Sequence, residues 1–179
     1  MNVELMLLTV LQGLRTQILD AGMLFFTHLG DAGFIWAALT AVLLVFRRTR
    51  RVGCVLAAAL LVDAVLCNLI LKPLVARIRP CDILADVQLL ISRPDDFSFP
   101  SGHTASSFAS VTALWLAGKK QWAFAALPLG VLIAFSRMYL FVHYPTDIIG
   151  GVLVGVGCGW IGAKLVEMFW QKNFAKSDL

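Results

Sequence analysis

Two histidines and an aspartate in the second half of the chain are residue types that could transfer a phosphoryl group. His143 precedes Pro145, a residue that suits the first position of a helix, and Asp147 lies four residues beyond the histidine. This spacing lets Asp147 accept the Nδ1 proton and leaves Nε2 of His143 as a nucleophile. His103 could then protonate the departing oxygen and later activate water.

Three basic residues could supply the positive charge that this chemistry needs. Lys72 and Arg79 are seven residues apart, close to two turns of a helix, so a helical continuation would hold both on one face. Pro73 and Pro80 could bend that geometry. Together with Arg137, these cations could clamp a phosphoryl group and stabilise the charge on its equatorial oxygens without a metal ion.

The segment Pro100-Ser101-Gly102-His103 has the features of a helix start that binds an anion. Ser101 suits the N-cap position, and Gly102 permits close backbone approach just before an apolar segment that begins at Thr104. The free N–H groups of such a helix start can hold a phosphate.

The segments that must position these residues have the composition of membrane helices. Hydrophobic residues make up 59% of the 179-residue chain and charged residues only 15%, against about a quarter in soluble proteins. Apolar stretches cover residues 33–46, 53–71, 104–117, 122–141 and 148–169. The stretches 33–46 and 104–117 are short and need their polar flanks to extend the helix. We predict one all-α domain over residues 1–179, a polytopic membrane bundle of about six helices with the active site at their outer ends.

The first stretch, residues 3–29, leaves two interpretations open. Arg15 and Asp20 interrupt its apolar pattern. It forms either an interfacial helix followed by a short span or a tilted span whose charges face protein. The N-terminus lacks the pattern of a cleaved signal, so we expect the first helix to remain in the mature protein.

Basic residues mark one side of the predicted bundle as cytoplasmic. They gather at Arg47, Arg48, Arg50 and Arg51, at Lys119 and Lys120, and at Lys172 and Lys176. Alternating spans then place the loop 73–103 and the turn 141–144 on the outer side, where the candidate site residues fall. We expect a multi-pass protein of a bacterial cell membrane, with its active site facing the extracytoplasmic side.

Three motifs together resemble the three-part signature of the type 2 phosphatidic acid phosphatase superfamily. They are Lys72 with Arg79-Pro80, Pro100-Ser101-Gly102-His103, and Ser136-Arg137 with His143 and Asp147. The match is complete at every motif position, and the composite is far more specific than any of its parts.

The resemblance implies a role for each residue of these motifs. His143 would be the nucleophile that forms a phosphohistidine, Asp147 would orient it, and His103 would be the acid/base. Phosphate would be bound by Lys72, Arg79, Ser101, Gly102 and Arg137. We expect no metal site and no other cofactor.

The resemblance also implies a lipid phosphatase, but the motifs do not choose its substrate. The small chain and the outward site favour undecaprenyl pyrophosphate, with phosphatidylglycerophosphate or phosphatidic acid as alternatives. A non-catalytic phospholipid transporter or receptor would need cations but no paired histidines, and the related vanadium-dependent haloperoxidases are mostly soluble. A lipid phosphate and membrane lipids are the expected partners, and nucleic acid is not one. The oligomeric state stays open.

The remaining polar residues are interpreted as structural. Asp63 lies in mid-span and is expected to pack with Asn68 or a backbone donor as its partner. His28 and Asp31 are expected at the interface. Solvated loop acids are expected at Asp82, Asp86, Asp95 and Asp96, and free thiols at Cys54, Cys67, Cys81 and Cys158.

Overall fold

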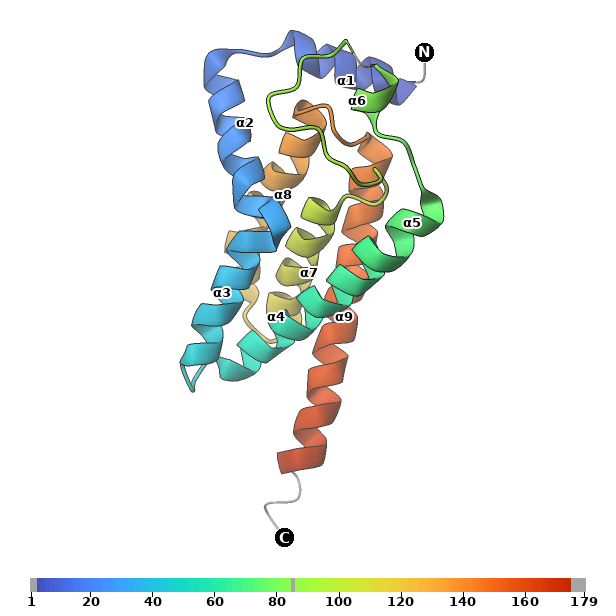
Figure 1. Ribbon diagram of the computed structural model, residues 1–179. Coiled ribbons are helices and arrows are strands. Elements are labelled where there is room, and N and C mark those ends of the chain that lie inside the picture. Colours follow the sequence, from blue (N-terminus) through green and yellow to red (C-terminus); the bar gives the residue numbers. More distant parts are fainter. Residues whose placement is uncertain (1–2, 85, 175–179) are drawn as a thin grey trace.

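The computed structural model describes residues 3–84 and 86–174, and the regular structure in these ranges is helical. Its elements are α1 (Val3–Gly13), α2 (Gln17–Gly30), a 3₁₀ turn (Asp31–Gly33), α3 (Phe34–Val45), α4 (Arg50–Asp63), a π-helical segment η2 (Ala64–Leu71), α5 (Lys72–Val75), α6 (Pro80–Ile83), α7 (Gly102–Leu116), α8 (Lys120–Tyr139) and α9 (Pro145–Phe174). Because α2 runs on into α3, and α4 runs through η2 into α5, the bundle consists of α1, α2–α3, α4–α5, α7, α8 and α9 (Figure 1). The predicted all-α membrane fold of about six helices is confirmed.

The N-terminal stretch forms a surface helix followed by the first half of a span. α1 lies across one end of the bundle, and α2 turns down from it along the side (Figure 1). The Thr16 side chain accepts a hydrogen bond from Leu19 N and caps α2. Arg15 pairs with Asp20 at 3.3 Å in this corner, so the two charges that interrupt the apolar pattern stabilise the turn between the helices.

The helix expected over residues 33–46 is the second half of a longer unit. α2 and α3 form one candidate span, Gln17–Val45, of 29 residues. Ala32 and Gly33 have left-handed backbone angles (φ 50° and 69°), which bend the unit without reversing the chain. The stretch before residue 33 is therefore not a span of its own.

The unit that carries the first signature residues contains an irregular turn. α4, η2 and α5 slant across the bundle in front of α7 (Figure 1). In the π-helical segment each turn takes up an extra residue, which changes the direction of side chains relative to an ordinary helix. Asp63 and Lys72, at the two ends of this segment, consequently line one cavity.

α7 lies in the centre of the bundle and packs closely against α9. A Cβ atom at Gly155 of α9 would lie 2.3 Å from the Ala105 carbonyl oxygen, so the glycine allows the two backbones to approach. α7 has 15 residues; it takes in Gly102 and His103 before the apolar stretch 104–117 and ends at Leu116. Pro100 disfavours a helical conformation in the residue that precedes it, and Gly118, with φ 79°, turns the chain after α7.

The candidate spans are Gln17–Val45, Arg50–Ile83, Lys120–Tyr139 and Pro145–Lys172.

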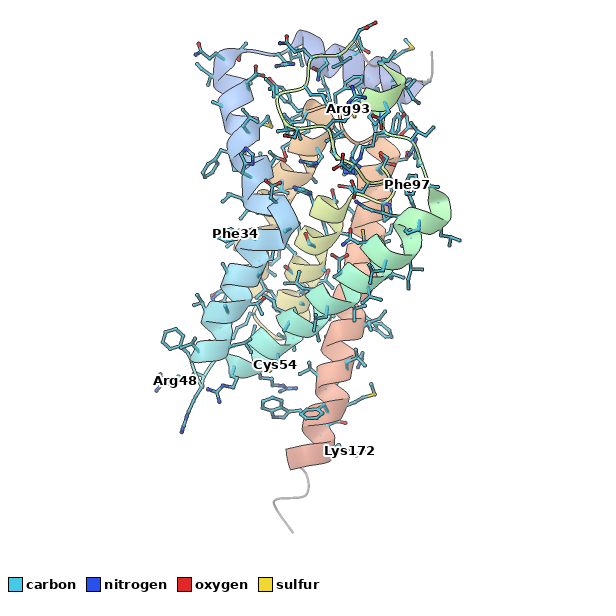
Figure 2. The ribbon with its side chains drawn as sticks, viewed as in Figure 1. Phe34, Arg48, Cys54, Arg93, Phe97 and Lys172 are labelled. Atoms are coloured by element: carbon cyan, nitrogen blue, oxygen red, sulfur yellow. The ribbon has the colours of Figure 1, made fainter. Side chains whose placement is uncertain are left out.

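The two ends of the bundle differ in charge: one carries the basic clusters, and the other carries the loop before α7. Arg48 and Lys172 lie at one end, and Arg93 and Phe97 lie at the other (Figure 2). At the basic end, a cavity of about 450 Å³ lies between α4, the α7–α8 turn and α9. Its lining includes Arg51, Gly118 and Lys164. The basic clusters on α4 and α9 therefore share one end, opposite the loop that precedes α7.

Candidate active site

A cavity of about 490 Å³ opens at the end of the bundle away from the arginine cluster. Most of the predicted site residues line it: Lys72, Arg79, Gly102, His103, Arg137 and His143. They come from α5, the chain before α6, the start of α7, the end of α8 and the turn before α9. The three motifs therefore meet in one place, although 71 positions separate Lys72 from His143.

Lys72 and Arg79 meet through a third residue and not through a shared helix face. α5 ends at Val75, and Ala76 takes a left-handed angle (φ 48°), so no continuous helix joins Lys72 to Arg79. Both cations instead bind the Asp96 carboxylate: Arg79 Nη2 lies 2.6 Å from Oδ1, and Lys72 Nζ contacts Oδ2. Asp96 is half exposed, as a loop acid would be, but it also pairs with two of the site cations, which the sequence did not suggest.

His143 presents one ring nitrogen to the cations. Its Nε2 lies 3.2 Å from Arg79 Nη1, and its Nδ1 lies 3.5 Å from Asp147 Oδ2. The ring is almost fully buried, with 1% of its surface exposed. Burial, supported by the charges of Arg79 and Arg137 and opposed by Asp147, lowers the pKa of His143 to about 3. The imidazole is therefore neutral at neutral pH, as a nucleophile must be.

Asp147 is held from several sides behind His143. Its carboxylate accepts hydrogen bonds from the Ser98 hydroxyl and from Tyr144 N at 2.8 Å, and it pairs with Arg77 at 2.6 Å. Arg77 in turn pairs with Glu4 of α1 at 2.7 Å. The surface helix is thereby connected to the carboxylate that faces His143.

His103 and Arg137 have partners on the α2 side of the cavity. His103 Nε2 lies 2.9 Å from Asp31 Oδ1, and Asp31 also contacts His28. One guanidinium nitrogen of Arg137 donates to the Thr27 hydroxyl, whereas its buried Nε has no hydrogen-bond partner among the described residues. Arg137 thus keeps a donor for a ligand.

Ser101 and Gly102 have different positions at the start of α7. Gly102 lines the cavity, and a Cβ there would lie 3.3 Å from the Asn68 side chain. Ser101 occupies the predicted N-cap position, but its side chain makes no capping hydrogen bond. Its hydroxyl accepts from Thr104 and its N–H donates to the Asp147 carbonyl oxygen at 3.1 Å, so Ser101 connects α7 to α9 behind the cavity.

Asp63 lies on the cavity wall, on the same side as Asn68 and Lys72. Its Oδ1 is buried and has no hydrogen-bond partner among the described residues. The expected bond to Asn68 or to a backbone donor is therefore not formed by this oxygen.

Sequence reasoning missed the residues that hold the signature residues in place. Asp96 was interpreted as a solvated loop acid and Asp31 as an interfacial residue, and Arg77 and Thr27 were not singled out. The one feature of the sequence that could have indicated a role for Arg77 was its position between Lys72 and Arg79.

Over residues 3–84 and 86–174, no group of three or more His, Cys, Asp or Glu side chains is placed to hold a metal ion, and the four cysteines are free thiols.

Comparisons with known proteins identify the family. The family model of the PAP2 superfamily matches residues 51–171. An undecaprenyl-diphosphatase of Sulfolobus acidocaldarius is 34% identical over 93% of this chain and 78% of its own length. Phosphatidylglycerophosphatase B of Bacillus subtilis is 31% identical over 80% of this chain and 73% of its own. The crystal structure of Aquifex aeolicus LpxE superposes with a TM-score of 0.78 at 32% identity, covering 92% of this chain and 96% of that one.

These matches include the helices of the bundle and the residues that line the cavity. The chain belongs to the PAP2 superfamily. It is a membrane lipid phosphatase, as the resemblance of its three motifs implied.

Proposed function

We propose that this protein hydrolyses a lipid pyrophosphate or lipid phosphate through a phosphohistidine on His143, with undecaprenyl pyrophosphate as the first candidate substrate. The observation that carries the proposal is the position of His143 Nε2, which lies 3.2 Å from Arg79 Nη1 in a cavity that Lys72 and Arg137 also line. A neutral nucleophile beside fixed cations is the arrangement that phosphoryl transfer requires.

In the first step, Nε2 of His143 attacks phosphorus and the bond to the leaving oxygen breaks. His103 donates its proton to that oxygen, while Lys72, Arg79 and Arg137 bind the equatorial oxygens. The imidazolium character that develops on His143 is stabilised by the Asp147 carboxylate, 3.5 Å from Nδ1.

In the second step, water attacks the phosphohistidine. His103, now neutral, accepts a proton from this water as the N–P bond breaks and inorganic phosphate forms. Asp31, 2.9 Å from His103 Nε2, holds the ring in place. Gly102 allows the phosphate to approach the start of α7, and Ser101 supports it from behind by joining α7 to α9.

The choice of substrate rests on the relatives. The undecaprenyl-diphosphatase matches over most of this chain, and phosphatidylglycerophosphatase B supplies the second candidate, a lipid phosphate monoester. The positive-inside distribution of Arg47–Arg51 supports an outward-facing site in a multi-pass membrane protein.

The direct test is release of inorganic phosphate by purified protein in detergent from a panel of undecaprenyl pyrophosphate, phosphatidylglycerophosphate and phosphatidic acid. We expect the highest kcat/KM with undecaprenyl pyrophosphate and no release by the His143→Ala variant, with folding checked by thermal melting. A transporter or receptor would bind these lipids without releasing phosphate. Absence of release from every lipid would refute the proposal.

A further inference from the structure

The two cations expected to bind phosphate already share one anionic ligand from the protein. The Asp96 carboxylate gives one oxygen to Arg79 and the other to Lys72. Arg79 Nε also donates to the Asp96 carbonyl oxygen at 2.8 Å, which fixes the backbone beside the guanidinium. Two oxygens of a bound phosphoryl group would need the same donors.

This carboxylate lies beside the nucleophile. Arg79 Nη2 donates a hydrogen bond to the Asp96 carboxylate, and Arg79 Nη1 lies 3.2 Å from His143 Nε2. A phosphoryl group in reach of His143 and the Asp96 carboxylate would therefore compete for one guanidinium. The Asp96 side chain is 52% exposed, so water can solvate the carboxylate when it leaves the two cations.

Asp96 is charged throughout the working range of pH. Burial raises its pKa, but the hydrogen bonds and charges of Lys72 and Arg79 outweigh this and lower the pKa of Asp96 to about 2. A tethered anion has an effective concentration on the order of millimolar or higher, so it competes well with free anions.

We propose that Asp96 is an internal competitor for the phosphate site, which substrate must displace and which returns to expel inorganic phosphate after hydrolysis. This inference rests on the proposed function. Displacement weakens the binding of every phosphate ligand by the same factor. A lipid substrate retains affinity because its chain also binds, whereas free phosphate has only its oxygens, and product inhibition is thereby reduced.

The inference is tested by titrating inorganic phosphate into purified Asp96→Asn and wild-type protein and measuring heat, with Asp95→Asn as the control. Asp95 is the exposed neighbouring carboxylate in the same loop. We expect Asp96→Asn to lower the Kd of inorganic phosphate at least tenfold and to lower KM for the lipid substrate by a similar factor, while Asp95→Asn matches wild type. A Kd within twofold of wild type would overturn the inference.

Removing the shared carboxylate leaves Lys72 and Arg79 without their anion, so the variants should be purified in phosphate that is then dialysed away. Asp96→Ala provides a second variant, with the same expected direction. The titration needs no turnover, so tighter phosphate binding without lipid hydrolysis would overturn the proposed function alone. Normal lipid hydrolysis by wild type with unchanged phosphate binding in both variants would overturn the role of Asp96 alone.

Discussion

Arg77 Nη1 lies 2.6 Å from Asp147 Oδ1, although Arg77 does not belong to the signature residues. The same guanidinium pairs with Glu4, and its carbon lies 4.0 Å from the centre of the Tyr144 ring. Arg77 therefore fixes the carboxylate that faces His143, without lining the cavity itself. Arg77 would therefore position His143, the proposed nucleophile, through Asp147.

We predict that Arg77→Gln lowers kcat by about tenfold to a hundredfold, the range expected for losing a hydrogen bond to a charged group. KM should change little, because Arg77 does not contact substrate, and Arg77→Lys should restore part of kcat. Steady-state kinetics on a lipid substrate provide the measurement. Arg93→Gln is the matched control, since Arg93 is an exposed arginine paired with Asp82 at 2.8 Å in the same region. A rise in KM with kcat unchanged would assign Arg77 to substrate binding instead.

The protonation of His143 gives a second prediction. Because its pKa is lowered from 6.5 to about 3, the neutral form should persist as the pH falls from 8 to 5. The chain has three histidines, so ¹⁵N-histidine NMR in detergent can resolve them, with His143→Ala to assign the signal. A His143 signal that titrates near pH 6.5 would show that burial and the neighbouring arginines do not control this ring.

The signature residues could be predicted from the sequence because their types and spacings match a known signature. The helices could be predicted because their apolar stretches are long. The residues that hold the signature residues in place could not be predicted from the sequence. Arg77 lies 73 positions from Glu4, and His103 lies 72 from Asp31, so neither pair leaves a periodic signal in the chain. Similarly, the bend at Ala32 and Gly33 depends on backbone angles that no local pattern required. A glycine at position 33 is equally compatible with a turn between two separate helices and with a bend inside one.

Metal independence is the third prediction. Lys72, Arg79 and Arg137 provide the positive charge that magnesium gives many phosphoryl-transfer enzymes. Phosphate release should therefore continue at its full rate after dialysis against EDTA. Loss of activity with EDTA and recovery with magnesium would instead point to the acids between α5 and α7, and Asp82→Asn and Asp95→Asn would then identify them.

The fourth prediction concerns sidedness. A single cysteine replacing Asp95, in a protein whose native cysteines are replaced, should react with an impermeant thiol reagent in intact cells, whereas one replacing Arg48 should not. Both positions are exposed, and Arg48 lies at the end opposite Arg93 and Phe97 (Figure 2). Permeabilised cells should label both cysteines. The reverse pattern in intact cells would place the cavity in the cytoplasmic leaflet.

The measurement that tests the nucleophile most directly is rapid quenching of the purified enzyme with undecaprenyl pyrophosphate labelled with ³²P at its terminal phosphate. A phosphohistidine is stable in alkali and labile in acid, so label should remain on the protein after alkaline quenching and disappear on acid treatment. We predict that peptide analysis assigns this label to His143 and that His143→Ala carries none. Label on another residue, or hydrolysis at the normal rate by His143→Ala, would contradict the proposed mechanism.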